Sequence, residues 1–82
     1  MGITADEYAT AIAEQLRAER SARRLTFKEL AERSGINEQS VLRYLNGKRD
    51  IPIPALYALA EGLEVTVHEV IARAESRLPG QD

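Results

Sequence analysis

Hydrogen-bonding side chains are concentrated between Asn37 and Arg49. Gln39 and Ser40 fall in the first turn of a predicted helix, and Arg43 follows Gln39 by four residues, which places these two side chains on one face. A glutamine amide can form two hydrogen bonds with the edge of adenine, and an arginine can form two with guanine. The chemistry that this segment offers is recognition of base pairs, with Gln39, Ser40 and Arg43 as the candidate readers.

Glu38 lies beside these groups, but its carboxylate is negatively charged, so DNA phosphates repel it. It can accept a hydrogen bond from cytosine N4, which would make it a fourth base-reading residue. It can equally stabilise the positive end of the helix dipole without touching DNA. Both interpretations of Glu38 stay open.

Covalent chemistry has little support in this sequence. The chain has no cysteine and a single histidine, His68, so it lacks the residues for a thiolate metal site or a multi-histidine site. Neither a Ser-His-acid arrangement nor a glycine-rich phosphate loop can be argued. We expect no catalytic residue, no metal, no cofactor and no enzymatic activity, and we expect His68 to be exposed.

Size and composition fit one globular domain over residues 1–82. Apolar residues make up 44% of the chain and charged residues 29%, as in ordinary folded proteins. The N-terminus lacks the basic and apolar stretches of a signal peptide, and no run of about 18 apolar residues occurs. We therefore expect a cytoplasmic protein with no membrane segment.

Apolar residues recur at helical spacing and no alternation of period two is sustained, so the fold should be all-α. Thr-x-x-Glu sequences at Thr4, Thr26 and Thr66 are typical of helix starts, because the hydroxyl and the carboxylate each satisfy part of the first turn. Gly35 and Gly47 are typical stops. The predicted helices cover residues 4–22, 26–34, 37–46, 54–62 and 66–78, followed by a flexible tail over 79–82.

The connector before the fourth predicted helix contains Pro52 and Pro54. Each proline pushes the residue before it into an extended conformation. We therefore predict that residues 50–54 form a rigid, non-helical segment.

Only Gly35-Ile36-Asn37 separates the second predicted helix from the third, so the two must cross steeply, as in a helix-turn-helix. The chain from Ile12 to about Ile71 resembles the Cro/C1-type (XRE) helix-turn-helix family of phage repressors and bacterial regulators. The likeness rests on LTFKELAERSGI at 25–36, VLRYLNGKR at 41–49 and LEVTV at 63–67. It implies a compact five-helix, lambda-repressor-like domain that binds double-stranded operator DNA in a bacterial cell or phage-infected host. Such proteins commonly act as symmetric dimers that repress or regulate transcription.

The resemblance also implies residues that hold the DNA backbone without reading its sequence. One departure concerns the start of the second helix, where the family most often has a phosphate-binding glutamine and this sequence has Phe27. That contact is lost or replaced, although the positive end of the helix dipole still suits a phosphate. The predicted phosphate contacts are Thr26, Lys28, Asn37, Asn46, Lys48 and Arg49.

The net charge of −2 is unusual for a protein that binds nucleic acid, but the charge is unevenly distributed. Residues 17–49 contain nine basic and four acidic residues, so this segment carries +5 and the remainder carries −7. Charge runs are ordinarily a solvated surface with pairs inside a helix, such as Glu29 with Arg33. Combined with the helix-turn-helix spacing, the basic segment instead indicates a side that faces DNA.

Two sets of apolar residues are candidates for contacts with other protein chains. The apolar stripe of the last predicted helix extends beyond what a small core needs, so Val70, Ala74 and Leu78 are candidates for a homodimer contact. A helix-turn-helix can also serve as a protein-interaction module, such as an antitoxin or a coactivator. In that alternative Phe27 and Leu42, which are apolar at positions expected to face outward, would contact a protein partner.

Overall fold

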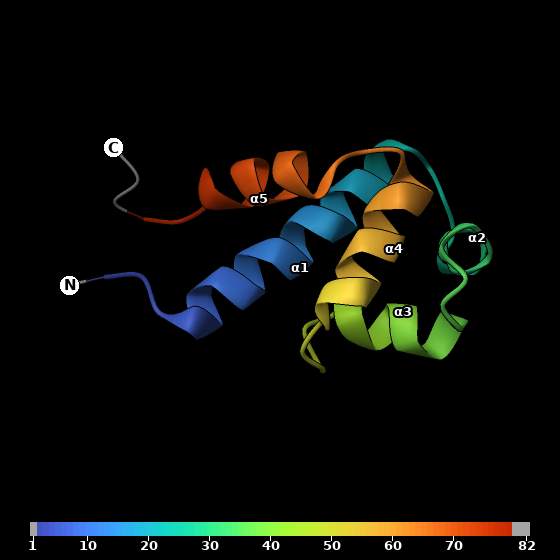
Figure 1. Cartoon of the computed structure of the whole chain (residues 1–82), viewed down its shortest axis with the longest axis horizontal. Helices are drawn as coiled ribbons and strands as arrows, with labels where there is room; N and C mark the ends of the chain where they lie inside the picture. The colour runs from blue at the N-terminus through green and yellow to red at the C-terminus, as the bar shows by residue number, and fades with distance from the viewer. Residues whose placement is uncertain (1, 80–82) are drawn as a thin grey trace.

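The computed structural model describes residues 2–79 and, within that range, contains five helices and no strand. The helices are α1 (Ala5–Ala22), α2 (Phe27–Ser34), α3 (Glu38–Leu45), α4 (Ile53–Leu63) and α5 (Val67–Glu75) (Figure 1). The predicted all-α, five-helix fold is confirmed. Of the predicted tail, Pro79 lies in a turn and residues 80–82 lie outside the described residues.

Capping boxes begin α1, α2 and α5, as the Thr-x-x-Glu sequences predicted. In α1 the Thr4 hydroxyl accepts the Glu7 N–H at 3.1 Å, and the Glu7 carboxylate accepts the Thr4 N–H at 2.9 Å. Thr26 and Thr66 start their helices in the same way. Each threonine keeps an extended backbone, so each helix starts one residue later than predicted.

The start of α4 corrects the predicted connector. α4 begins at Ile53, with Pro52 as its N-cap and Pro54 in its first turn. A proline in the first turn lacks only an N–H that has no partner within the helix, so Pro54 is tolerated there. The non-helical segment therefore ends at Pro52, and the prediction that it reaches residue 54 is wrong.

Among residues 2–79, seven large side chains are fully buried, and all five helices contribute to them: Leu16, Leu30, Val41, Leu45, Leu59, Leu63 and Val70. They belong to the main core, in which α1 packs against α5 and α2 against α4. Figure 1 shows α4 crossing the molecule between α1 and α2, with α3 next to the start of α4. α3 packs against α2 and α1, and its other side lies at the surface.

α5 is shorter than predicted, and its apolar residues are already covered by the chain itself. It ends at Glu75, and the Leu78 N–H then donates to the Glu75 carbonyl at 3.1 Å in a turn. Val70 is fully buried, and Ala74 and Leu78, 2% and 8% exposed, pack beside Ala11 of α1 in a second small cluster. The prediction that this stripe is left over from the core is wrong, so a dimer contact through these three residues is not supported.

A polar network fixes α5 along α1. Gln15 and Glu19 of α1 are buried, and the Gln15 amide donates to the Glu19 carboxylate at 2.6 Å. From α5, Arg73 donates to the Glu19 carboxylate at 2.9 Å, and Arg77, just beyond the helix, donates to the side-chain Oε1 atom of Gln15 at 2.8 Å. The two buried side chains are therefore hydrogen-bonded to one another and to the C-terminal part of the chain.

Candidate nucleic-acid interface

Gly35 and Asn37 fix the turn between α2 and α3. Gly35 has φ 75° and ψ 11°, and its N–H donates to the Ala31 carbonyl at 2.9 Å, which ends α2. Glycine suits this left-handed conformation because it has no Cβ. The Asn37 Oδ1 atom then accepts the Ser40 N–H at 2.8 Å and caps α3. The two helices are thus joined by the short turn that the sequence predicted.

α3 has one buried side and one exposed side. The buried residues are Val41, Tyr44 and Leu45. The exposed residues include Glu38, Gln39 and Arg43, whereas Ser40 is half-buried. The structure therefore presents three of the four predicted base-reading residues fully at the surface and covers the fourth in part.

The turn after α3 presents three of the predicted phosphate contacts. Gly47 has φ 70°, and its N–H donates to the Tyr44 carbonyl at 3.2 Å. The Lys48 N–H donates to the Arg43 carbonyl at 2.9 Å, which completes a Schellman motif after the C-cap Asn46. The three predicted contacts of this turn are all exposed: Asn46, Lys48 and Arg49. Their backbone is held by the helix end, so the side chains project from an ordered turn.

Two arginines support this end of α3. The Arg49 guanidinium carbon lies 5.3 Å from the centre of the Tyr44 ring, within cation–π distance. Arg17 of α1 donates to the carbonyl of Leu45, the last residue of α3. A cation there satisfies a carbonyl that the helix leaves free and complements the negative end of its dipole. Sequence reasoning missed this contact, because no local pattern links Arg17 to a carbonyl 28 residues away.

The exposed basic side is smaller than the sequence count suggested. Arg20 donates to the Leu25 carbonyl at 2.6 Å, and Arg23 forms an ion pair with Glu19 at 2.7 Å, so both arginines, like Arg17, have partners within the chain. Six basic residues of the 17–49 segment remain exposed: Arg24, Lys28, Arg33, Arg43, Lys48 and Arg49. The last three belong to α3 and to the turn that follows it.

Phe27 has a structural role at the start of α2. It is half-buried and packs against the main core, and the Arg20 guanidinium carbon lies 4.5 Å from the centre of its ring. The core covers one part of the Phe27 side chain and Arg20 another, so only the remaining part faces outward, and a protein contact through Phe27 stays a prediction. Leu42 is also half-buried.

The start of α2 carries both signs of charge. The Thr26 hydroxyl accepts the Glu29 N–H at 3.0 Å, and the Glu29 carboxylate accepts the Thr26 N–H at 2.8 Å. The backbone hydrogen bond from Thr26 lowers the pKa of the Glu29 carboxyl below its ordinary value, so Glu29 is ionised at neutral pH. Lys28 is exposed beside it and offsets this negative charge. Of the two predicted phosphate contacts here, Lys28 is the one whose polar group is not occupied by capping the helix.

Within residues 2–79, no three His, Cys, Asp or Glu side chains lie close enough together to hold a metal ion. His68 is exposed, as predicted. The described part of the chain contains no helix with the length and apolar character needed to cross a membrane.

A family model described as a helix-turn-helix domain matches residues 11–72. The HTH-type transcriptional repressor RghR of Bacillus subtilis (strain 168) is 42% identical over 62 residues, which is 74% of this chain and 46% of that protein. The uncharacterised HTH-type transcriptional regulator RghRB of the same organism is 42% identical over 62 residues, 74% of this chain and 45% of that protein. The chain thus spans slightly less than half the length of these curated relatives.

A solved structure shares the fold. The clp gene regulator ClgR from C. glutamicum superposes with a TM-score of 0.82 at 23% sequence identity, and the match covers 90% of this chain and 96% of that one. At this identity the likeness establishes the arrangement of helices alone.

Proposed function

The chain belongs to the helix-turn-helix family whose model matches residues 11–72, and from this premise we propose that it binds specific double-stranded operator DNA and represses transcription. The observation that carries the proposal is the exposure of one side of α3 at the protein surface. The helix is buried on one side, and its other side exposes Gln39 and Arg43 next to an ordered basic turn. The name of the RghR relative, a transcriptional repressor, supports the same function.

Sequence readout is assigned to the exposed side of α3 in the major groove. Gln39 and Arg43 are four residues apart and exposed, so one helix face can offer a glutamine amide to adenine and a guanidinium to guanine. Ser40 lies in the same turn, but it is half-buried and its side chain is short, so it extends less far from the helix. Glu38 sits at the N-terminus of α3, where it stabilises the helix dipole and is placed to accept from cytosine.

Phosphate binding is assigned to the two ends of the helix-turn-helix and to the turn between its helices. After α3, the exposed side chains of Asn46, Lys48 and Arg49 extend from the Schellman turn. Before α3, Asn37 uses its Oδ1 atom as a cap, which leaves its amide nitrogen as the donor. At the start of α2, Lys28 supplies the charge, and the Thr26 hydroxyl proton is a weaker contribution because its oxygen caps the helix.

The first test selects duplexes from a random DNA pool with the purified protein and titrates the best binder against salt. An enriched sequence whose log affinity falls with log salt would show base readout together with counterion release. Absence of enrichment at low salt would overturn the proposal.

Three variants then separate base recognition from binding to the phosphate backbone. Arg43→Ala should cost about 1–3 kcal/mol of binding free energy and relax the preference at one base position, whereas Lys48→Ala should weaken all sequences alike and reduce the salt slope by about 1. Arg33→Ala is the matched control, because Arg33 is an exposed arginine of α2 outside the predicted contacts. Equal behaviour of the Arg43 and Arg33 variants would contradict the assignment of Arg43.

A further inference from the structure

One apolar side chain of α3 lies outside the core. Val41, Tyr44 and Leu45 of this helix are buried members of the main core. Leu42 is half-buried, and within residues 2–79 it is not among the side chains that pack against either apolar cluster. Part of its apolar surface therefore stays in contact with water, on the helix that the proposed function places in the major groove.

The neighbours of Leu42 on the surface of α3 are polar. Residues three and four positions apart share one face of a helix, so Leu42 lies next to Glu38, Gln39 and Asn46. These three side chains are exposed, and so is that of Arg43, which directly follows Leu42. Predicted base-reading and phosphate-binding residues thus surround this one apolar side chain.

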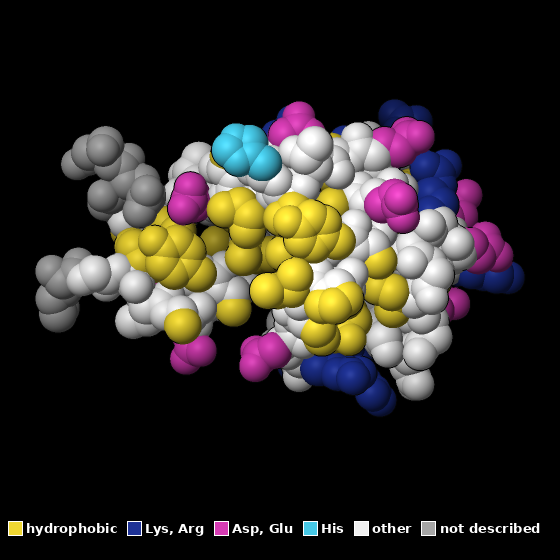
Figure 2. All heavy atoms as spheres, in the orientation of Figure 1, with side chains coloured by type: hydrophobic (Ala, Val, Ile, Leu, Met, Phe, Trp, Pro, Cys, Tyr) yellow, Lys and Arg dark blue, Asp and Glu magenta, His cyan; other side chains and the backbone are white. Residues whose placement is uncertain are grey.

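The larger apolar surface of the chain lies elsewhere. Ile53 and Tyr57 of α4 are 69% and 61% exposed, and Figure 2 shows apolar side chains spread over α1, α4 and α5 on the side facing the viewer. Basic side chains lie along the lower and right-hand edges of that view, and Figure 1 places α3 in the lower part of the molecule. A protein partner held by apolar contacts has that larger surface available, whereas Leu42, alone among polar groups, suits the edge of a base.

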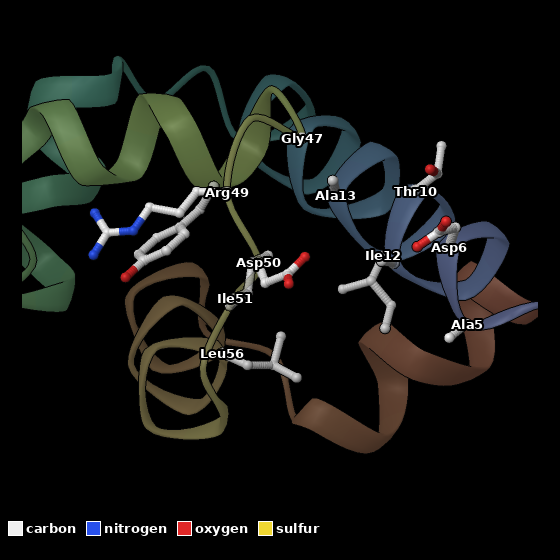
Figure 3. A pocket seen from close by; sticks show the side chains of 12 residues that line it. Ala5, Asp6, Thr10, Ile12, Ala13, Gly47, Arg49, Asp50, Ile51 and Leu56 are labelled. Carbon is white, nitrogen blue, oxygen red and sulfur yellow. The ribbon is translucent and has the colours of Figure 1, made fainter.

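The turn after α3 sets the position of Leu42 relative to the DNA backbone. The Arg49 side chain points away from Asp6 and Asp50, two acids that line the same pocket, so its guanidinium is left for a phosphate (Figure 3). Asn46 is exposed at the start of the same turn. Leu42 precedes Asn46 by four residues, which is about 6 Å along the helix axis. A helix held on phosphates at this turn therefore places Leu42 further into the groove.

We propose that Leu42 recognises thymine by packing against its C5-methyl group, a role that rests on the DNA binding proposed above. In the major groove, thymine differs from the other three bases in presenting this methyl group. A leucine side chain neither donates nor accepts hydrogen bonds, so the contact adds a kind of recognition that Gln39 and Arg43 do not supply. Those two residues would read adenine and guanine through hydrogen bonds.

The expected contribution is modest and independent of salt. Burial of one methyl-sized group corresponds to about a four-fold change in affinity. The contact involves no charge, so its loss should leave the slope of log affinity against log salt unchanged. A lost phosphate contact, such as that of Lys48→Ala, should instead reduce the slope by about 1.

Replacement of thymine by uracil tests the contact without altering the protein, because uracil lacks only the methyl group. In the duplex that the unaltered chain enriches, each dT of the bound site is replaced in turn by dU, and the affinity is measured over a range of salt concentrations. At least one replacement should weaken binding about four-fold with an unchanged salt slope. An enriched site without dT, or a site where no replacement weakens binding, would overturn the proposal.

Variants of the protein then assign the methyl contact to one side chain. Leu42→Ala should bind the dT and dU duplexes alike, whereas Leu42→Met, which stays apolar and of similar volume, should keep the preference for dT. Ile71→Ala is the matched control and should keep the full preference, because Ile71 is a half-buried aliphatic residue of α5 outside the predicted contacts. A full dT preference in Leu42→Ala would overturn the proposal and leave Leu42 to the protein-contact alternative.

Failure of this role and failure of the proposed function give different results. Sequence-specific binding that does not depend on the thymine methyl group would refute the role of Leu42 alone. Absence of sequence-specific binding by the unaltered chain would refute the proposed function, and the role of Leu42 with it.

Discussion

Replacing Glu19 by glutamine tests the network that joins α1 to α5. The Glu19 side chain is 6% exposed, and its carboxylate accepts from Arg23 at 2.7 Å, from Arg73 at 2.9 Å and from Gln15 at 2.6 Å. Glutamine keeps the shape of the side chain but removes the charge, and it turns one acceptor atom into a donor. At least one arginine therefore loses its bond to this side chain, although Arg23 still donates to the Glu19 backbone carbonyl and Arg73 still pairs with Glu69.

The expected loss is smaller than for an ion pair in a dry interior. Removing one partner of a buried pair costs about 3–5 kcal/mol, because the remaining charge stays buried. Here the Arg23 and Arg73 side chains are 31% and 47% exposed, so water can solvate them after the change. A loss of about 2 kcal/mol follows, as for hydrogen bonds to charged groups. At about 4–8 °C per kcal/mol for a domain of this size, Tm should fall by roughly 10 °C.

The pH dependence provides an independent check. Burial raises the pKa of the Glu19 carboxyl, but hydrogen bonds from Arg73, Gln15 and Arg23 outweigh burial, so the pKa lies below its ordinary value of 4.5. The carboxylate therefore contributes stability that is fully present above the unfolded-state pKa and is lost as the pH falls through the lower, folded-state pKa. The stability difference between the parent and Glu19→Gln should be constant near neutral pH and shrink in acid.

Urea denaturation followed by circular dichroism, from neutral pH into the acid range, measures both quantities. Glu75→Gln is the matched control, because Glu75 is an exposed acid on α5, and its replacement should change stability by less than about 0.5 kcal/mol. If Glu19→Gln were no less stable than Glu75→Gln at neutral pH, or if its deficit stayed constant into acid, the network would not have the assigned role.

Three further predictions concern stability and can be checked by the same denaturation assay. Glu64 has φ 60°, so Glu64→Gly should relieve left-handed strain and stabilise the chain by about 0.5–1 kcal/mol; a loss would contradict this account of the turn after α4. A Cβ on Gly62 would lie 3.3 Å from the Ser34 nitrogen of α2. The bulkier Gly62→Val should therefore lower the free energy of unfolding by about 1–3 kcal/mol. An unchanged denaturation midpoint would show that α2 and α4 can separate freely. Arg17→Ala should lower the free energy of unfolding by about 1–2 kcal/mol, because the Leu45 carbonyl loses its side-chain donor. An unchanged free energy would mean that water replaces the guanidinium without penalty.

The helices and their order could be predicted because the signals that form them are local. A threonine and a glutamate three residues apart accept hydrogen bonds from the free backbone N–H groups at a helix start, without help from the rest of the chain. The boxes at Thr4, Thr26 and Thr66 all do so. Gly35 ends α2 through its own backbone preference. The same locality made α3 recognisable, since the spacing of Gln39 and Arg43 along a helix decides that they share a face.

The start of α4 was misplaced for a local reason, the tolerance of Pro54 in a first turn, whereas the other errors in the sequence-based prediction arose where a side chain meets residues distant in the sequence. Arg17 counts as positive charge in the sequence but holds the end of α3, and Phe27 was expected to face outward but lies against the core beneath Arg20. Ala74 is another example, since only the packing of α5 on α1 covers it. Periodicity shows that a helix has an apolar side, but not which surface that side meets.

The sequence by itself thus determined five helices, the tight turn at Gly35 and the chemistry available on α3, because backbone preferences and helical spacing act over a few residues. Only the tertiary structure decided which arginines remain exposed, that the apolar side of α5 is covered by α1, and that Ile53 and Tyr57 are left at the surface. Those outcomes depend on contacts between helices far apart in the chain. Ile53 and Tyr57 are the most exposed large apolar side chains of the described residues, and helical spacing alone did not predict this.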